Sequence, residues 1–190
     1  MSERESVPPP PAPLRRQFDA SLLRRAFGQF ATGVAVIGVR AADGSLAGMT
    51  VNSFASVSID PPLVMYCPSK GLGAYSAYIG ARYFSACVLA SGQRSLSERF
   101  ARKGERKWLD VAYTLGESGV PLLDEAIAGF ECEVVANHDA GDHGIVLGRV
   151  LALRLAGVGE PLIFHCSRYC MLAQAATETE APAAALAWGL

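Results

Sequence analysis

A row of small polar side chains between residues 48 and 62 is the first part of this chain whose residue types could do chemistry. Thr50, Asn52, Ser56 and Ser58 are separated by even numbers of residues, so in an extended strand their side chains point to one face. Hydroxyl and amide groups on one face can hydrogen-bond a heteroaromatic ring or a phosphate. A half-exposed strand with a solvated polar face has the same pattern, and the spacing alone favours that second interpretation.

A second group of reactive residue types lies within residues 137–144. His138, His143 and two aspartates could in principle ligate a metal ion. Residues of one short loop seldom converge on an ion without a distant ligand, and the only other histidine is His165. We therefore expect no metal site, and the glycines and aspartates of this segment favour a hairpin turn.

Strands must position most of these residues. The apolar spacing predicts a short helix over residues 19–30, capped by Asp19, whose apolar face covers another part of the protein. Asp43 and Gly44 indicate the turn of a hairpin. Strands are predicted over residues 34–39, 46–54, 63–67, 83–89, 130–137, 145–155 and 162–166.

Two further helices interrupt the predicted strands. One is short and covers about residues 74–80, after a glycine-bearing loop. The other is predicted to open at a capping box formed by Ser95 and Glu98, with Phe100 pointing inward. Residues 103–118 are polar and irregular, which predicts a surface segment.

This series of elements predicts a mainly β protein with short helices. Several strands are joined by short turns and not by helical crossovers, so a mostly antiparallel barrel fits better than a doubly wound sheet. No GxGxxG motif follows a predicted strand, and no Walker lysine motif occurs. A dinucleotide or flavin would therefore be bound without the Rossmann arrangement of strand, glycine-rich turn and helix.

Length and composition bound the remaining possibilities. The chain has 190 residues, which suits one domain, with 51% hydrophobic residues, 18% charged residues and a formal net charge of -1. This balance does not favour nucleic acid as a partner. We expect a proline-rich disordered arm at residues 1–17, a domain at 18–172 and a low-complexity tail at 173–190.

The sequence also predicts the compartment. The first residues carry charge and proline instead of the apolar core of a secretory signal, and no later stretch is apolar for long enough to span a bilayer. The five cysteines form no CxxC pair, so we interpret them as reduced and mainly structural. We expect a cytoplasmic protein with no membrane partner.

Four segments together resemble the short-chain flavin reductase family. These segments occur in the family's order and cover roughly residues 18 to 172. They are residues 30–36 (FATGVAV), residues 48–63 (GMTVNSFASVSIDPPL), Gly141-Asp142-His143 with Gly148, and residues 161–164 (PLIF) with Tyr169. The resemblance implies a homodimeric split β-barrel that binds a flavin.

The resemblance also implies a flavin-binding segment. It places Thr50, Asn52, Ser53, Phe54 and Ala55 along the isoalloxazine ring and ribityl chain, largely through backbone groups, and we include Ser56 with them. Hydrogen-bond donors at the flavin edge would stabilise the charge that develops on reduction. A hydride passes directly between stacked cofactors, so we expect no catalytic side chain.

Other site residues are likewise implied by the family pattern. Ser69 and Lys70 lie where the family places phosphate contacts, although a solvated lysine on a loop is an equally good interpretation of Lys70. His143 is implied to orient NADH or NADPH. Tyr169 is implied to reach toward a flavin bound by the other subunit, and the alternative is a tyrosine packed at the rim.

The chain departs from the family pattern at two positions. Cys87 stands where the family has an asparagine that faces the flavin, so we count Cys87 among the expected flavin contacts. The loop threonine expected after the phosphate-contact serine is absent, with Gly71 and Gly73 nearby. Neither FMN nor FAD is therefore favoured over the other.

The resulting prediction is an NAD(P)H:flavin oxidoreductase that passes hydride to FMN or FAD and supplies reduced flavin to a partner monooxygenase. One alternative is a flavin carrier or sensor without reductase turnover. Another is an oxidase on a related split barrel that uses flavin for a different substrate. The Gly141-Asp142-His143 motif favours the reductase, because a carrier needs no nicotinamide site.

Overall fold

The computed structural model describes residues 14, 16–104, 106–156 and 159–172. Its helices are α1 (Ala20–Phe27), α2 (Tyr75–Gly80) and α3 (Arg94–Ala101), with a 3₁₀ turn η1 (Ser91–Gln93) before α3. Its strands are β1 (Thr32–Gly33), β2 (Ala35–Arg40), β3 (Leu46–Val51), β4 (Ala55–Ser58), β5 (Leu63–Tyr66), β6 (Tyr83–Val88), β7 (Tyr113–Leu115), β8 (Pro121–Leu123), β9 (Ala128–Ala140), β10 (His143–Leu155), β11 (Ile163–His165) and β12 (Arg168–Cys170). The predicted tail and most of the predicted arm lie outside the described residues.

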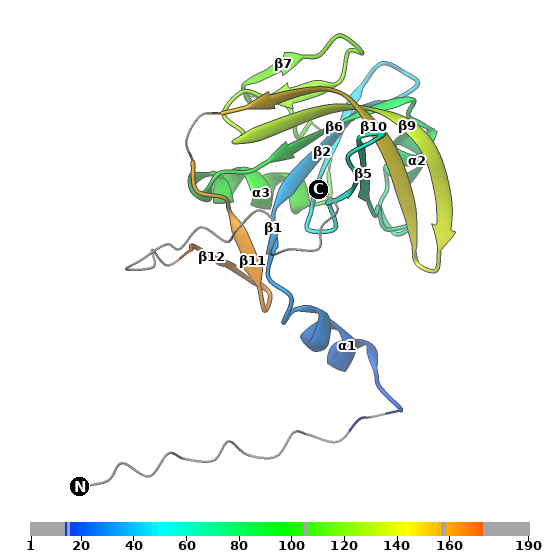
Figure 1. Ribbon diagram of the computed structural model, residues 1–190, viewed down its shortest axis with the longest axis vertical. Helices are drawn as coiled ribbons and strands as arrows, with labels where there is room; N and C mark the ends of the chain where they lie inside the picture. Colours follow the sequence, from blue (N-terminus) through cyan, green and yellow to red (C-terminus); the bar gives the residue numbers. More distant parts are fainter. Residues whose placement is uncertain (1–13, 15, 105, 157–158, 173–190) are drawn as a thin grey trace, which may run out of the picture.

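The largest sheet has seven antiparallel strands in the order β3-β2-β6-β9-β10-β5-β4. Its two edge strands, β3 and β4, follow each other in the chain and are connected only by residues 52–54. This connection can span at most roughly 14 Å, whereas a flat sheet of this many strands would be roughly 29 Å wide. The sheet therefore curls until its edges approach, which makes a barrel with an open seam between β3 and β4 (Figure 1).

Two apolar clusters pack against this sheet. Alternate residues of β2 enter different clusters, Ile37 the first and Val36 the second, because successive side chains of a strand point to opposite faces. In the first cluster the rings of Tyr66 and Phe84 pack with centroids 4.9 Å apart. In the second, fully buried Phe100 of α3 packs against an indole from the following loop. The sheet is thus covered on both faces near the seam.

Helix α1 begins as predicted but has little apolar packing among the described residues, where only Leu22 and Leu23 are half-buried. The Asp19 carboxylate accepts a hydrogen bond from the backbone N–H of Leu22 at 2.8 Å, which caps the helix. The helix ends at Phe27 and contains no buried residue. Phe27 and Phe30 are 71% and 78% exposed. The predicted apolar packing of this helix is therefore incomplete within the described part of one chain.

The predicted capping box at the start of α3 is wrong. The helix already begins at Arg94, so Ser95 lies inside its first turn. The side-chain oxygen of Gln93 accepts from the backbone N–H of Ala90 at 2.9 Å and so caps the start of the preceding 3₁₀ turn. Glu98 pairs with Arg94 at 2.8 Å instead of capping the backbone. The inward position of Phe100 is as predicted.

The segment 103–118 is less irregular than its polarity predicts. Trp108 is buried against Phe100, with ring centroids 4.7 Å apart, and β7 pairs with β8 in a two-stranded sheet. One indole buries enough apolar surface to hold a polar segment against the core. The polarity of residues 103–118 alone therefore predicted too little regular structure for this segment.

Strand boundaries differ from the prediction in three places. The strand predicted over residues 46–54 ends at Val51, and a separate strand, β4, begins at Ala55 on the other side of the seam. The strands β9 and β10 continue up to a tight turn at Gly141, whose φ is 67°, in place of the longer predicted loop. Strand β12 was not predicted; it pairs with β11 and carries Tyr169. Among the described residues, no helix has the length and apolar character needed to cross a membrane.

Candidate functional site

A cavity of about 280 Å³ opens at the seam of the barrel. Strand β3 and the connection after it form one wall, the residues after β5 form a second, and the end of α3 and the start of β10 close the remaining sides. It is lined by Met49, Thr50, Val51, Asn52, Ser53, Cys67, Ser69, Leu72, Phe100, Ala101 and His143. Residues that the sequence analysis assigned to flavin, phosphate and nicotinamide therefore meet in one place.

The connection between the two edge strands presents free hydrogen-bond donors. Among the described residues, the backbone N–H groups of Asn52, Ser53 and Phe54 form no hydrogen bond to another protein group. The side-chain hydroxyls nearby are already engaged: that of Thr50 donates to the carbonyl of Ser97 at 2.6 Å, and that of Ser53 accepts from a backbone N–H at 3.0 Å. Together with the Asn52 side-chain amide, which makes no hydrogen bond to the described part of the chain, these backbone groups are the donors available to a ligand on this wall.

Three residues of the predicted flavin segment lie outside the cavity lining. Phe54 packs against Phe130, with ring centroids 5.6 Å apart, so its side chain supports the barrel. Ala55 and Ser56 begin the exposed edge strand β4. The expected run of contacts from residue 50 to residue 56 is therefore divided at the seam.

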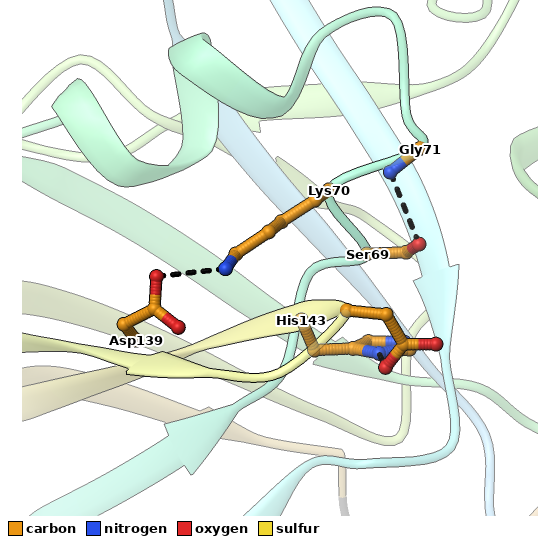
Figure 2. A network of polar contacts seen from close by, with 6 residues as sticks. Ser69, Lys70, Gly71, Asp139 and His143 are labelled. Atoms are coloured by element: carbon orange, nitrogen blue, oxygen red, sulfur yellow. Dashed lines mark hydrogen bonds and ion pairs between the residues drawn. The ribbon is translucent and has the colours of Figure 1, made fainter.

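The loop after β5 is hydrogen-bonded to the tip of the β9–β10 hairpin. The backbone N–H of Lys70 donates to the carbonyl of Asp142, and that of Gly144 donates to the carbonyl of Pro68, both at 2.9 Å. These bonds hold Ser69 opposite His143 (Figure 2). The Ser69 hydroxyl accepts from the backbone N–H of the second residue after it, at 3.3 Å. Two chain segments far apart in sequence thus form one wall of the cavity.

Lys70, an expected phosphate contact, does not line the cavity. Its ammonium group lies 2.7 Å from a carboxylate oxygen of Asp139 on β9, and Figure 2 shows the side chain directed toward that partner and away from the Ser69 hydroxyl. This hydrogen bond raises the pKa of Lys70 and lowers the pKa of Asp139. Ser69 remains at the cavity, while the charge of Lys70 is matched by a surface carboxylate.

His143 lies at the cavity with one ring nitrogen already bonded. Its Nδ1 is 2.7 Å from a carboxylate oxygen of Asp142. That hydrogen bond lowers the pKa of Asp142, so the carboxylate is ionised at neutral pH and accepts. Nδ1 of His143 therefore carries the hydrogen, and in the neutral ring Nε2 is left as an acceptor for a ligand.

Two other predicted contacts lie away from the cavity lining. Cys87 is fully buried in the second apolar cluster, and its sulfur accepts from the backbone N–H of Leu123 at 3.3 Å. Burial raises the pKa of this thiol to about 11. The expected contact between the Cys87 side chain and a flavin is therefore wrong, because the side chain of this β6 residue points into the core. Tyr169 packs on Phe164, with centroids 5.5 Å apart, at the rim of the same cluster.

Sequence reasoning missed half of the lining. The missed residues are mostly apolar: Met49, Val51, Cys67, Leu72, Phe100 and Ala101. Met49 and Val51 have the opposite parity to the polar row, so the pattern that selected Thr50 and Asn52 did not include them. Only the position of Phe100 near the end of a predicted helix could have indicated a role beside the seam. Within the described residues, no group of three or more histidine, cysteine, aspartate or glutamate side chains could hold a metal ion.

The chain matches the model of the flavin reductase like domain over residues 27–173. It belongs to the flavin reductase family. The match spans the seam, the cavity and both strands of the hairpin that carries His143. Family membership and the mainly β antiparallel fold therefore agree with the resemblance found in the sequence.

The names of similar proteins are consistent with membership of this family. An FMN reductase (NADH) from Agrobacterium fabrum is 45% identical over 141 residues, which cover 74% of this chain and 79% of the relative. An NADH-dependent FAD reductase from Streptomyces globisporus is 37% identical, covering 90% and 96%. The solved structure of an NADH:FAD oxidoreductase from Streptomyces globisporus, in complex with NAD and FAD fragments, has a TM-score of 0.81 at 36% identity and covers 87% of this chain and 100% of its own.

The lining of the cavity fits the flavin that this family name implies. Free backbone donors at residues 52–54 suit the polar edge of an isoalloxazine ring, and the side chains of Met49, Leu72 and Phe100 suit its apolar surface. A volume of about 280 Å³ is close to the lower end of ligand sites, which begin at about 300 Å³. The cavity therefore has the size for a ring system, and the rest of a nucleotide would extend beyond it.

Proposed function

We propose that this chain is an NAD(P)H:flavin oxidoreductase whose flavin, FMN or FAD, is bound at the seam of the barrel. One observation carries the proposal: Asn52, Ser53, Ser69 and His143, assigned from sequence to flavin, phosphate and nicotinamide, line a single cavity. Two relatives are named as NADH-dependent flavin reductases, so NADH is the first donor to test.

The residues of the seam bind and orient, and do not exchange protons. Bound flavin supplies the acceptor of a hydride that reduced nicotinamide supplies. The N–H groups of Asn52 and Ser53, which form no hydrogen bond within the described part of the chain, donate to the ring edge on which charge develops. Ser69 accepts from a neighbouring N–H and still has a hydroxyl hydrogen to donate to a phosphate.

His143 would orient the nicotinamide as an acceptor. Its Nδ1 is held by Asp142 at 2.7 Å, and the remaining Nε2 of the neutral ring can accept from the N–H₂ group of a carboxamide. A carrier of flavin would need no such group, so this arrangement favours the reductase over the carrier. An oxidase acting on a different substrate would likewise need no nicotinamide site.

Anaerobic stopped-flow mixing tests the function. We expect the protein loaded with FMN or FAD to lose flavin absorbance at about 450 nm on mixing with NADH or NADPH, because hydride transfer bleaches the oxidised ring. A flavin-loaded protein that neither donor bleaches would support the carrier and contradict the reductase. A protein that binds neither FMN nor FAD would contradict both.

Removing the imidazole of His143 is expected to raise the KM for NADH by roughly two- to tenfold, the equivalent of one hydrogen bond of about 0.5 to 1.5 kcal/mol. The flavin Kd of His143→Ala should stay within about twofold of the parent, since the flavin contacts are backbone groups on β3 and its connection. Steady-state rates at limiting NADH measure the first quantity and flavin fluorescence quenching the second.

His138→Ala is the matched control, because this residue lies on the same hairpin and does not line the cavity. Parent-like KM values in both variants would place the nicotinamide site elsewhere. A collapse of flavin binding in His143→Ala alone would instead assign His143 to the flavin.

The exposed apolar surface of the chain supports the further proposal of a homodimer. Phe27 and Phe30 of the α1 region, and Leu151, Leu153 and Leu155 of β10, are all at least half exposed. A monomer seldom leaves this many large apolar side chains in water. A second copy related by a twofold axis would cover the same residues on both chains.

Sedimentation at micromolar concentration is expected to give the mass of two chains. Leu153→Glu, which introduces a charge into the exposed row of β10, should shift the protein toward the monomer, and Ala42→Glu on the exposed turn of the β2–β3 hairpin should not. A parent protein that sediments as a monomer while turning over flavin would overturn the dimer.

Delivery of reduced flavin to a monooxygenase is supported by the names of other relatives. A reductase subunit of a flavin-dependent monooxygenase from Rhodococcus jostii is 34% identical over 80% of this chain. A cavity that holds only the ring system of a flavin is compatible with release of the reduced product. The cytoplasmic location stays a prediction.

A further inference from the structure

Ser97 is a polar residue without a role in the proposed reaction, although it is fully buried beside the flavin cavity. It lies in the middle of α3, on the face that also carries Phe100. A buried hydroxyl without a partner costs roughly 1 to 3 kcal/mol, so its hydrogen bonds indicate why a serine occupies this position.

The backbone carbonyl and the hydroxyl of Ser97 contact different parts of the fold. Its carbonyl accepts from the Thr50 hydroxyl at 2.6 Å, and Thr50 lines the cavity on β3. Its side-chain oxygen lies 2.9 Å from the hydroxyl of Tyr169 on β12. One residue therefore connects the wall of the cavity with the last strand that the structure describes.

The strand on the far side of this connection belongs to a separate small sheet. Strands β1, β11 and β12 pair only with one another among the described residues, and Figure 1 shows them beside the barrel. The ring of Tyr169 is held in place by the guanidinium group of Arg94, 5.3 Å from the ring centre, and by Phe164. The Tyr169 hydroxyl thus offers Ser97 a partner at a defined position.

We propose that Ser97 is a positioning residue that joins Tyr169 of the small sheet to Thr50 in the cavity wall, and that flavin affinity depends on this connection. The inference rests on the proposed flavin site. Its physical basis is that a ligand bound by backbone donors of β3 and residues 52–54 has high affinity only if this edge of the sheet is rigid. The edge strand β3 has a sheet partner on one side only, and the hydrogen bond from Thr50 to Ser97 attaches it to α3 as well.

The test compares Ser97→Ala, Tyr169→Phe and the double variant, each of which removes the bond between the two hydroxyls. We expect each single variant to bind FMN roughly three- to tenfold more weakly, as for the loss of one hydrogen bond, with kcat at saturating FMN within about twofold of the parent. The double variant should bind FMN no more weakly than the weaker single variant, because both changes remove the same interaction. Ser95→Ala, an exposed serine on the same helix, is the control.

Flavin fluorescence quenching gives the Kd, and thermal unfolding is recorded alongside. Parent-like affinity in both single variants, even with a lower unfolding midpoint, would show a merely structural role and overturn the inference. Effects that multiply in the double variant would also overturn it, because the two residues would then act separately. Failure of the unmodified chain to bind FMN or FAD would overturn the proposed function itself.

Discussion

Asn52→Trp is expected to abolish flavin binding, with a loss of at least about 100-fold in affinity, or about 2.7 kcal/mol. Asn52 lines the cavity of about 280 Å³, and its side chain is exposed. An indole placed there would occupy the space that the isoalloxazine ring needs. Since Asn52 makes no hydrogen bond to the described part of the chain, the fold should lose little stability. Fluorescence quenching of FMN and FAD measures the affinity, and thermal unfolding checks the fold.

Ala42→Trp provides the matched control. Ala42 is exposed at the turn of the β2–β3 hairpin and lies outside the cavity lining, so the same side chain there should leave flavin affinity unchanged. Parent-like flavin binding by a folded Asn52→Trp protein would show that the flavin lies elsewhere. The proposed site would then be rejected, although the family membership would stand.

Gly148→Ala is expected to destabilise the fold by about 2 to 3 kcal/mol, as for overpacking of a closed core. A Cβ at Gly148 would lie 2.3 Å from the nearest ring atom of Phe84 and 3.3 Å from the Cβ of Cys132. Phe84 cannot move aside, because it is fully buried and packed against the ring of Tyr66. The unfolding midpoint should fall by roughly 5 to 10 °C for a domain of this size.

This result would assign a role to the glycine that follows Gly141-Asp142-His143 in the family pattern. We expect Gly148→Ala to keep the parent's KM for NADH in whatever fraction remains folded, because Gly148 lies in the core and outside the cavity lining. Gly33→Ala is the control, since a Cβ there meets no atom within 4 Å. Equal unfolding midpoints for the two variants would contradict this account.

Much of the architecture could be predicted from local sequence pattern. The β-branched run around residue 36, the Asp43-Gly44 turn and the capping residue Asp19 each act over a few neighbouring residues, and each forms the expected element. The start of α3 was mispredicted because the competing hydrogen bond, from the Ala90 N–H to Gln93, is also local but follows an alanine where a capping box normally has serine or threonine. The segment around Trp108 was mispredicted because its order comes from a contact with Phe100 across the fold.

The sequence predicted which segments contribute to the candidate site, but it did not predict where in the fold these segments meet. Residue types and family pattern selected Asn52, Ser69 and His143, and the structure brings these three to one cavity. The same reasoning also selected Lys70 and Cys87, which the structure directs to a surface carboxylate and to the core. Side-chain direction depends on strand register and on distant partners, and neither can be read from spacing along one segment.

The sequence by itself determined the family, the mainly antiparallel β class and the segments that contribute to the site, because turn residues, strand alternation and motif order are properties of short stretches. Only the tertiary structure decided that β3 and β4 form the two edges of one curled sheet. Within the part of the chain that the structure describes, that closure leaves the N–H groups of residues 52–54 without hydrogen-bond partners and brings His143 and the end of α3 to the same cavity. The physical reason is that closure depends on the pairing of strands far apart in the chain, and such pairing is set by the packing of the whole core rather than by any one segment.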